Sequence, residues 1–60
     1  MLEYFKTILS KVSFDKKQFE KELLKAIKQL LSDELSVFRE WCYEKFGKIH
    51  EPILNRSFAA

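Results

Sequence analysis

The sequence predicts an all-α fold, a small three-helix bundle followed by a C-terminal turn or a short fourth helix. Apolar residues recur at helical spacing in three segments, over 2–12, 15–31 and 32–46. The chain contains one glycine and one proline, so the connections between these segments are short. Short connections favour helices that pack against their neighbours in sequence. With 60 residues, of which 47% are hydrophobic, the chain is predicted to form a single helical domain over 1–60.

The helix predicted over 2–12 places its apolar residues on one face, because they lie three or four residues apart. No side chain before it offers a cap, and we therefore expect its first turn to fray. The apolar face consists of Leu2, Phe5, Leu9 and Val12, with Tyr4 and Ile8 at its flanks.

The helix predicted over 15–31 has a well-marked start. Asp15 is the expected N-cap, and Gln18 stands where its side chain would complete a capping box with the Asp15 amide. Phe14 and Phe19 occupy the two positions of a hydrophobic staple. The apolar residues of this helix are Phe19, Leu23, Ala26, Ile27, Leu30 and Leu31.

The third helix is predicted to begin at Ser32 or Asp33 and to end at Phe46. Ser32 is the expected N-cap, and the acidic residues after it suit the positive end of the helix dipole. Gly47 is the expected C′ residue, because glycine adopts the left-handed conformation at that position without penalty. The apolar stripe consists of Leu35, Phe38, Cys42 and Phe46, with Tyr43 and Trp41 on its two edges.

Residues 48–60 give a weaker pattern, and two interpretations remain open. Pro52 suits the first position of a helix, and Leu54 and Phe58 lie one turn apart. These features suit a short fourth helix, and a loose tail is the alternative.

The residues predict no enzyme, no cofactor and no metal site. Cys42 and His50 are the only soft or borderline metal ligands, whereas protein zinc sites take at least three. Cys42 falls in an apolar stripe, which disfavours a thiolate nucleophile, and more than a helical turn separates it from His50. Glu40 and Glu44 lie one turn apart on the polar face, where carboxylates are normally solvated. We therefore expect a non-catalytic protein without a small-molecule substrate.

Composition and charge set the expected location. The net charge of +2 is small and requires neither nucleic acid nor an anionic membrane as partner. Charged residues interrupt the N-terminus, and no stretch approaches the roughly 18 apolar residues that span a bilayer. A single cysteine fits a reducing compartment. A cytoplasmic location without a membrane partner is therefore expected.

The leading functional hypothesis is a protein–protein interaction module that self-associates as a homodimer. The apolar arcs of the first and third helices are wider than the roughly 100° that a surface helix needs. This is more apolar surface than three helices readily bury in a chain without a disulfide or metal. Two-fold dimers are the commonest form of self-association. The predicted partner-binding residues are Tyr4, Ile8, Val37 and Trp41.

The alternative hypothesis is a small nucleic-acid-binding protein. Lysines recur every three or four residues on the helix over 15–31, and such a basic ridge follows phosphates. Glu20 and Glu22 dilute the positive field of this helix, and no arginine lies on it to read base edges. The residues of this lysine ridge are Lys17, Lys21, Lys25 and Lys28.

Overall fold

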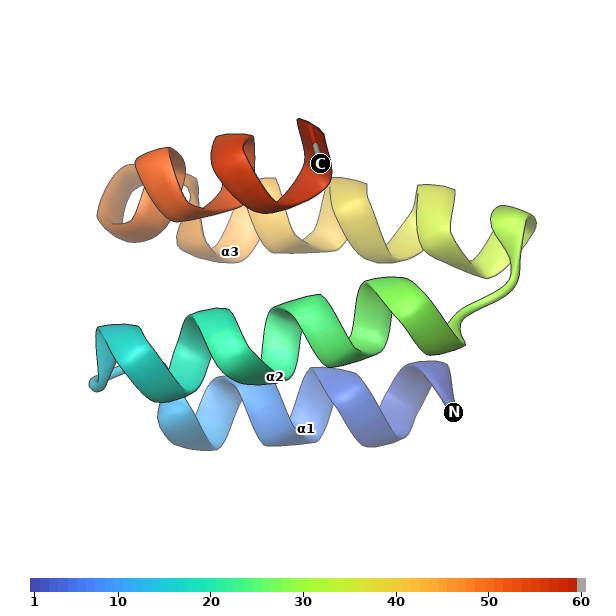
Figure 1. The fold of residues 1–60 in the computed structure, drawn as a ribbon, viewed down its shortest axis with the longest axis horizontal. Helices are drawn as coiled ribbons and strands as arrows, with labels where there is room; N and C mark the ends of the chain where they lie inside the picture. The colour runs from blue at the N-terminus through green and yellow to red at the C-terminus, as the bar shows by residue number, and fades with distance from the viewer. Residues whose placement is uncertain (60) are drawn as a thin grey trace.

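The computed structural model describes residues 1–59 and confirms an all-α fold in which three helices pack together. In chain order these helices are α1 (Leu2–Val12), α2 (Lys16–Gln29) and α3 (Ser32–Ala59). α1 and α2 lie side by side as an antiparallel pair, and α3 packs against both of them (Figure 1). The second half of α3 turns back along its first half, which gives the chain its compact shape (Figure 1).

α1 has the predicted bounds and buries the predicted face. It follows Met1, whose side chain makes no capping hydrogen bond. Phe5 and Leu9 are fully buried, and Leu2 and Val12 pack against the core in partly buried positions. The spacing of the apolar residues therefore identified the side of α1 that meets the other helices.

The start of α2 confirms the predicted cap and corrects the two features around it. The Asp15 carboxylate accepts hydrogen bonds from the amides of Lys17 at 3.0 Å and Gln18 at 3.2 Å. The Asp15 amide donates to the Val12 carbonyl at 3.0 Å, so the reciprocal half of a capping box does not form. The predicted staple is also wrong, because Phe14 is 86% exposed while Phe19 is fully buried.

The second helix ends two residues before the predicted Leu31, whereas α3 begins at Ser32, which is one of its two predicted starts. α2 ends at Gln29, and Leu30 is extended with φ −80° and ψ 144°. Leu31, instead of the predicted Ser32, is the N-cap residue of α3, since its carbonyl accepts from the Leu35 amide at 2.7 Å. Glu34 supplies the capping side chain, because its Oε1 accepts from the Leu31 amide at 3.3 Å. The Leu31 side chain is left 69% exposed.

α3 continues past the position where the sequence predicted its end. Gly47 has no positive φ and lies within the helix, so the predicted C′ role is wrong. The helix kinks at His50, whose φ of −122° and ψ of 26° are not helical. Pro52 explains the kink, since proline provides no amide donor and its ring crowds the preceding turn.

The C-terminal segment is helical, and the structure does not support a separate fourth helix. Residues beyond the kink form the second half of α3, which ends at Ala59. A loose tail is equally excluded for the described part of the chain, and Ala60 lies outside it. Ile53 and Leu54 are buried in the common core, so this half of α3 is part of the domain.

All three helices contribute to one hydrophobic core. The centre of this core is aromatic. The Phe19 and Phe46 rings meet there edge to face, with 5.0 Å between their centroids. His50 stacks on Phe19 at 4.3 Å with an interplanar angle of 26°. The buried apolar residues are Phe5, Leu9, Phe19, Leu23, Ala26, Leu30, Phe38, Cys42, Phe46, Ile53 and Leu54.

Asp15→Ala should lower the free energy of unfolding by about 0.5–2 kcal/mol, because it removes the acceptor for two amides of the first turn of α2. Thermal or chemical denaturation followed by circular dichroism measures this loss. Gln18→Ala is the matched control and should change stability by less, because the Asp15 amide already has its partner in Val12. Equal effects of the two substitutions would contradict this assignment of the cap.

Candidate interaction surfaces

The turn between α1 and α2 is fastened to the kink of α3 by a single imidazole. His50 Nε2 lies 2.7 Å from the Ser13 carbonyl oxygen, and this bond joins residues 37 positions apart in sequence. A carbonyl only accepts hydrogen bonds, so Nε2 carries the proton and donates it. The His50 side chain is only 3% exposed. The bond therefore fixes the position of the turn relative to the kink.

This fastening holds two large apolar side chains at one end of the molecule. We call it the turn end and define it by residues 11–17 and 47–53, which lie together opposite the α2–α3 connection (Figure 1). Phe14 is 86% exposed and Ile49 is 67% exposed, and each is the sequence neighbour of a residue in the His50–Ser13 bond. Sequence reasoning missed both, because the staple was expected to cover Phe14 and the third helix to stop before Ile49.

A cleft of about 290 Å³ opens at the turn end, between the start of α2 and the two halves of α3. Its buried surface includes His50 and Ile53. Arg56 Nε donates to Glu20 Oε2 at 3.0 Å, and this hydrogen bond raises the pKa of Arg56. The residues that line the cleft are Lys16, Lys17, Glu20, Ile49, His50, Pro52, Ile53 and Arg56.

The four predicted partner-binding residues lie on two surfaces instead of one. Tyr4 and Val37 are 57% and 51% exposed, whereas Ile8 and Trp41 are half-buried. Lys6 Nζ lies 5.6 Å from the centroid of the Trp41 ring, which places the Lys6 side of α1 next to α3. Tyr4 and Ile8 project from the other side of α1, because helical geometry puts them across the buried face from Lys6.

Trp41 is packed mainly by its own helix. Its ring stacks on Phe38 at 6.0 Å and meets Phe46 edge to face at 5.5 Å. Phe58, from the second half of α3, packs instead against Tyr43 at 6.1 Å. Trp41 therefore forms the rim of the core on the α1 side, where Lys6 covers part of it.

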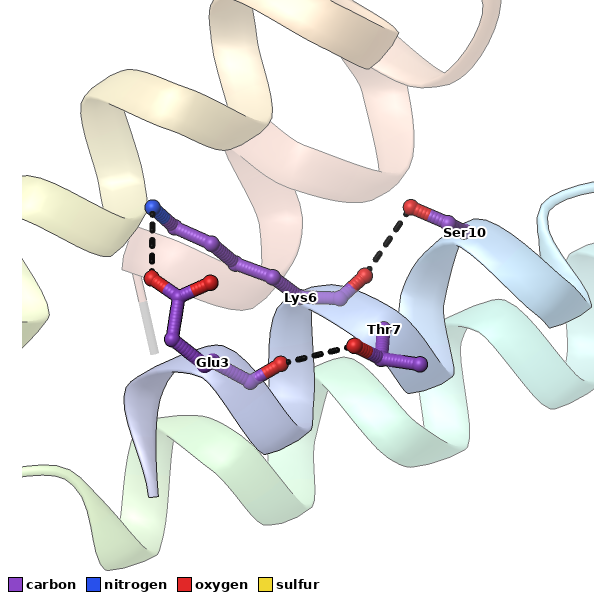
Figure 2. Close-up of polar contacts among 4 residues, drawn as sticks. All are labelled: Glu3, Lys6, Thr7 and Ser10. Carbon is purple, nitrogen blue, oxygen red and sulfur yellow. Dashed lines mark hydrogen bonds and ion pairs between the residues drawn. The ribbon is translucent and has the colours of Figure 1, made fainter.

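The polar face of α1 has its side chains engaged locally. Figure 2 shows Lys6 reaching to the carboxylate of Glu3, at 3.5 Å. The hydroxyls of Thr7 and Ser10 donate to the carbonyls of Glu3 at 3.0 Å and Lys6 at 2.9 Å. Such bonds to the preceding turn are ordinary for helical serine and threonine. This face therefore presents no hydroxyl poised for chemistry.

The lysine ridge lies on the exposed side of α2, and its four residues are all exposed. Glu20 is bonded to Arg56, which draws this carboxylate away from the lysines. Glu22 still dilutes the ridge, because its Oε1 pairs with Lys25 Nζ at 3.6 Å. Within residues 1–59, the other three ridge lysines form no ion pair. The ridge is therefore a row of exposed lysines of which one is paired.

The single cysteine lies in the core. Cys42 is fully buried, and this burial raises the pKa of its thiol to about 12. At neutral pH the thiol is therefore protonated and a poor nucleophile. Among residues 1–59, no group of three or more potential ligands could hold a metal ion. In the same part of the chain, no helix is long and apolar enough to cross a membrane.

His50→Phe should lower the free energy of unfolding by about 1–3 kcal/mol, because the Ser13 carbonyl loses its donor while an aromatic ring remains on Phe19. Chemical denaturation measures the difference. His50→Ala removes the ring as well and should cost more, since it leaves a cavity. Wild-type stability in the His50→Phe variant would show that the hydrogen bond contributes nothing.

Comparison with known proteins gave no match to a protein family, to a curated protein or to a solved structure. A functional proposal for this chain therefore depends on the arrangement of its own residues.

Proposed function

We propose that the protein is a non-catalytic helical interaction module that self-associates. One observation supports this most directly: large apolar side chains are exposed at both ends of a bundle whose core is already closed. Phe14 and Ile49 are 86% and 67% exposed at the turn end. At the opposite end, Met1 and Leu31 are 62% and 69% exposed. We call this second end the connection end and define it by residues 1–4 and 28–34.

The distribution of these residues matters more than their number. Single apolar residues scattered over a surface are normal, whereas apolar residues gathered in patches mark contact sites. The exposed large apolar residues between the two ends, Val37 at 51% and Leu24 at 38%, are less exposed than those at the ends. The ends are therefore the parts of the surface that gain most from a partner.

The symmetric homodimer remains a prediction. In a two-fold interface, a residue of one subunit contacts a different residue of the partner and the reverse contact also forms. A two-fold dimer that uses all four predicted residues therefore brings Tyr4 and Ile8 of each subunit against Val37 and Trp41 of the other. We propose that such association takes place in the cytoplasm, where a single unpaired cysteine is stable.

At micromolar protein the average molar mass should be near that of the 7.2-kDa chain. It should rise as the protein concentration is increased to millimolar. The exposed apolar area is small, so we expect weak association. Sedimentation equilibrium over this range measures the mass and the association constant together. A mass that stays at that of one chain up to the highest concentration would contradict self-association.

Nucleic-acid binding is a second candidate, and the geometry of the lysine ridge is the observation that favours it. Pairing of Glu20 with Arg56 removes one carboxylate from the field of the ridge. The remaining positive charge lies along one side of a single helix and suits contact with a row of phosphates. The ridge belongs to α2 and is separate from Tyr4 and Val37, so the two functions are compatible.

We expect weak binding to duplex DNA. The logarithm of the association constant should fall linearly with the logarithm of the salt concentration, at a slope of about −0.9 for each phosphate contacted. Fluorescence anisotropy of a labelled duplex over a salt series measures this slope. Charge reversal by Lys21→Glu with Lys25→Glu should abolish the binding. The same change at two exposed lysines of α3, Lys45→Glu with Lys48→Glu, is the control. Tight binding at physiological salt that depends on the ridge would make nucleic acid the main partner.

A further inference from the structure

The two ends of the bundle carry complementary charges as well as apolar side chains. The turn end holds Lys11, Lys16, Lys17 and Lys48 against the carboxylates of Asp15 and Glu51. Asp15 is already engaged in capping α2. The connection end holds the carboxylates of Glu3, Asp33 and Glu34 against the terminal amine and Lys28. The turn end is therefore basic. The connection end is weakly acidic, and its acidic character comes from Asp33 and Glu34, because Glu3 is paired with Lys6 at 3.5 Å. Contact between unlike ends is favoured over contact between like ends.

The connection end presents a fixed apolar projection next to its carboxylates. Leu31 is the N-cap residue of α3, and its amide and carbonyl are both bonded to the first turn of that helix. Its side chain is 69% exposed. Asp33 Oδ1 accepts from the Glu34 amide at 2.9 Å, and Glu34 Oε1 accepts from the Leu31 amide at 3.3 Å, so both carboxylates are held at the first turn of α3. The Leu31 side chain and the carboxylates of Asp33 and Glu34 are thus held by the backbone at the start of α3.

The turn end offers the matching receptor. Its cleft of about 290 Å³ is lined on the apolar side by Ile49, Pro52 and Ile53. Lys16 and Lys17 line the other side and are exposed. The cleft is large enough for one aliphatic side chain, and Lys16 and Lys17 are exposed at its edge to any carboxylate that enters beside that side chain. Glu20 and Arg56 also line the cleft and are paired with each other.

We propose that the connection end of one copy docks at the turn end of the next, with Leu31 in the cleft and Asp33 and Glu34 facing Lys16 and Lys17. This inference rests on the proposed self-association and specifies how it takes place. The contact joins two different surfaces of the same chain, so each copy keeps one free receptor and one free projection. Such a head-to-tail contact builds open chains or rings, whereas a two-fold contact stops at the dimer.

Two substitutions at exposed positions test this arrangement. Leu31→Ser removes the projection, and Ile49→Ser removes one apolar wall of the receptor. Each variant alone should associate at least about tenfold more weakly than the wild type, because an aliphatic contact is lost. An equimolar mixture should regain association as a one-to-one complex, because one intact receptor and one intact projection remain. Leu24→Ser removes an exposed leucine between the two ends and should behave as the wild type.

Sedimentation velocity of the wild type, the variants and the mixture distinguishes the outcomes, with circular dichroism as the check on folding. The proposal expects wild-type species larger than a dimer, a mixture limited to a dimer, and weaker association at high ionic strength. Wild-type association that stops at a dimer, or that survives both substitutions, overturns the head-to-tail contact and leaves self-association intact. A wild type that stays monomeric overturns both proposals.

Discussion

His50 stands where two of the three interruptions of the helical chain meet. One interruption is the turn after α1, and the other is the kink that Pro52 imposes on α3. The imidazole donates to the Ser13 carbonyl at 2.7 Å and stacks on Phe19 at 4.3 Å. This one side chain therefore does two things: it donates a hydrogen bond to a carbonyl in the turn, and it adds an aromatic ring to the core. Pro52 sets the kink, and this contact joins the kink of α3 to the turn between α1 and α2.

The folded-back half of α3 lets so short a chain close its core. A domain of this size buries only about 60% of the surface that its unfolded chain exposes, so each additional apolar segment matters. Ile53 and Leu54 enter the core from beyond the kink. Phe58 packs on Tyr43, and Arg39 lies over both rings at 5.1 and 5.9 Å. The monomer thus uses the apolar stripe of its third helix internally, and the residues left exposed lie mostly at the ends.

Periodicity identified most of what is local in this fold, and the misses come from contacts between distant residues. Asp15 was recognised as a cap because its partners are two and three residues away. Gly47 resembled a helix terminus. A glycine inside a helix lowers stability by only about 1 kcal/mol, and the burial of the residues before and after Gly47 in α3 outweighs that loss. The site is harder to foresee. Phe14, Ile49 and the cleft lie next to a bond between residues 37 positions apart, and local periodicity cannot predict such a contact.

The protonation of His50 tests the central claim most directly. A long-range nitrogen–proton correlation spectrum reports which ring nitrogen carries the proton and whether the two forms interconvert. The structure predicts that Nε2 carries a proton, held there by the Ser13 carbonyl. An Nε2 without a proton, or the averaged signals of a solvated imidazole, would contradict the account of how the turn and the kink are joined.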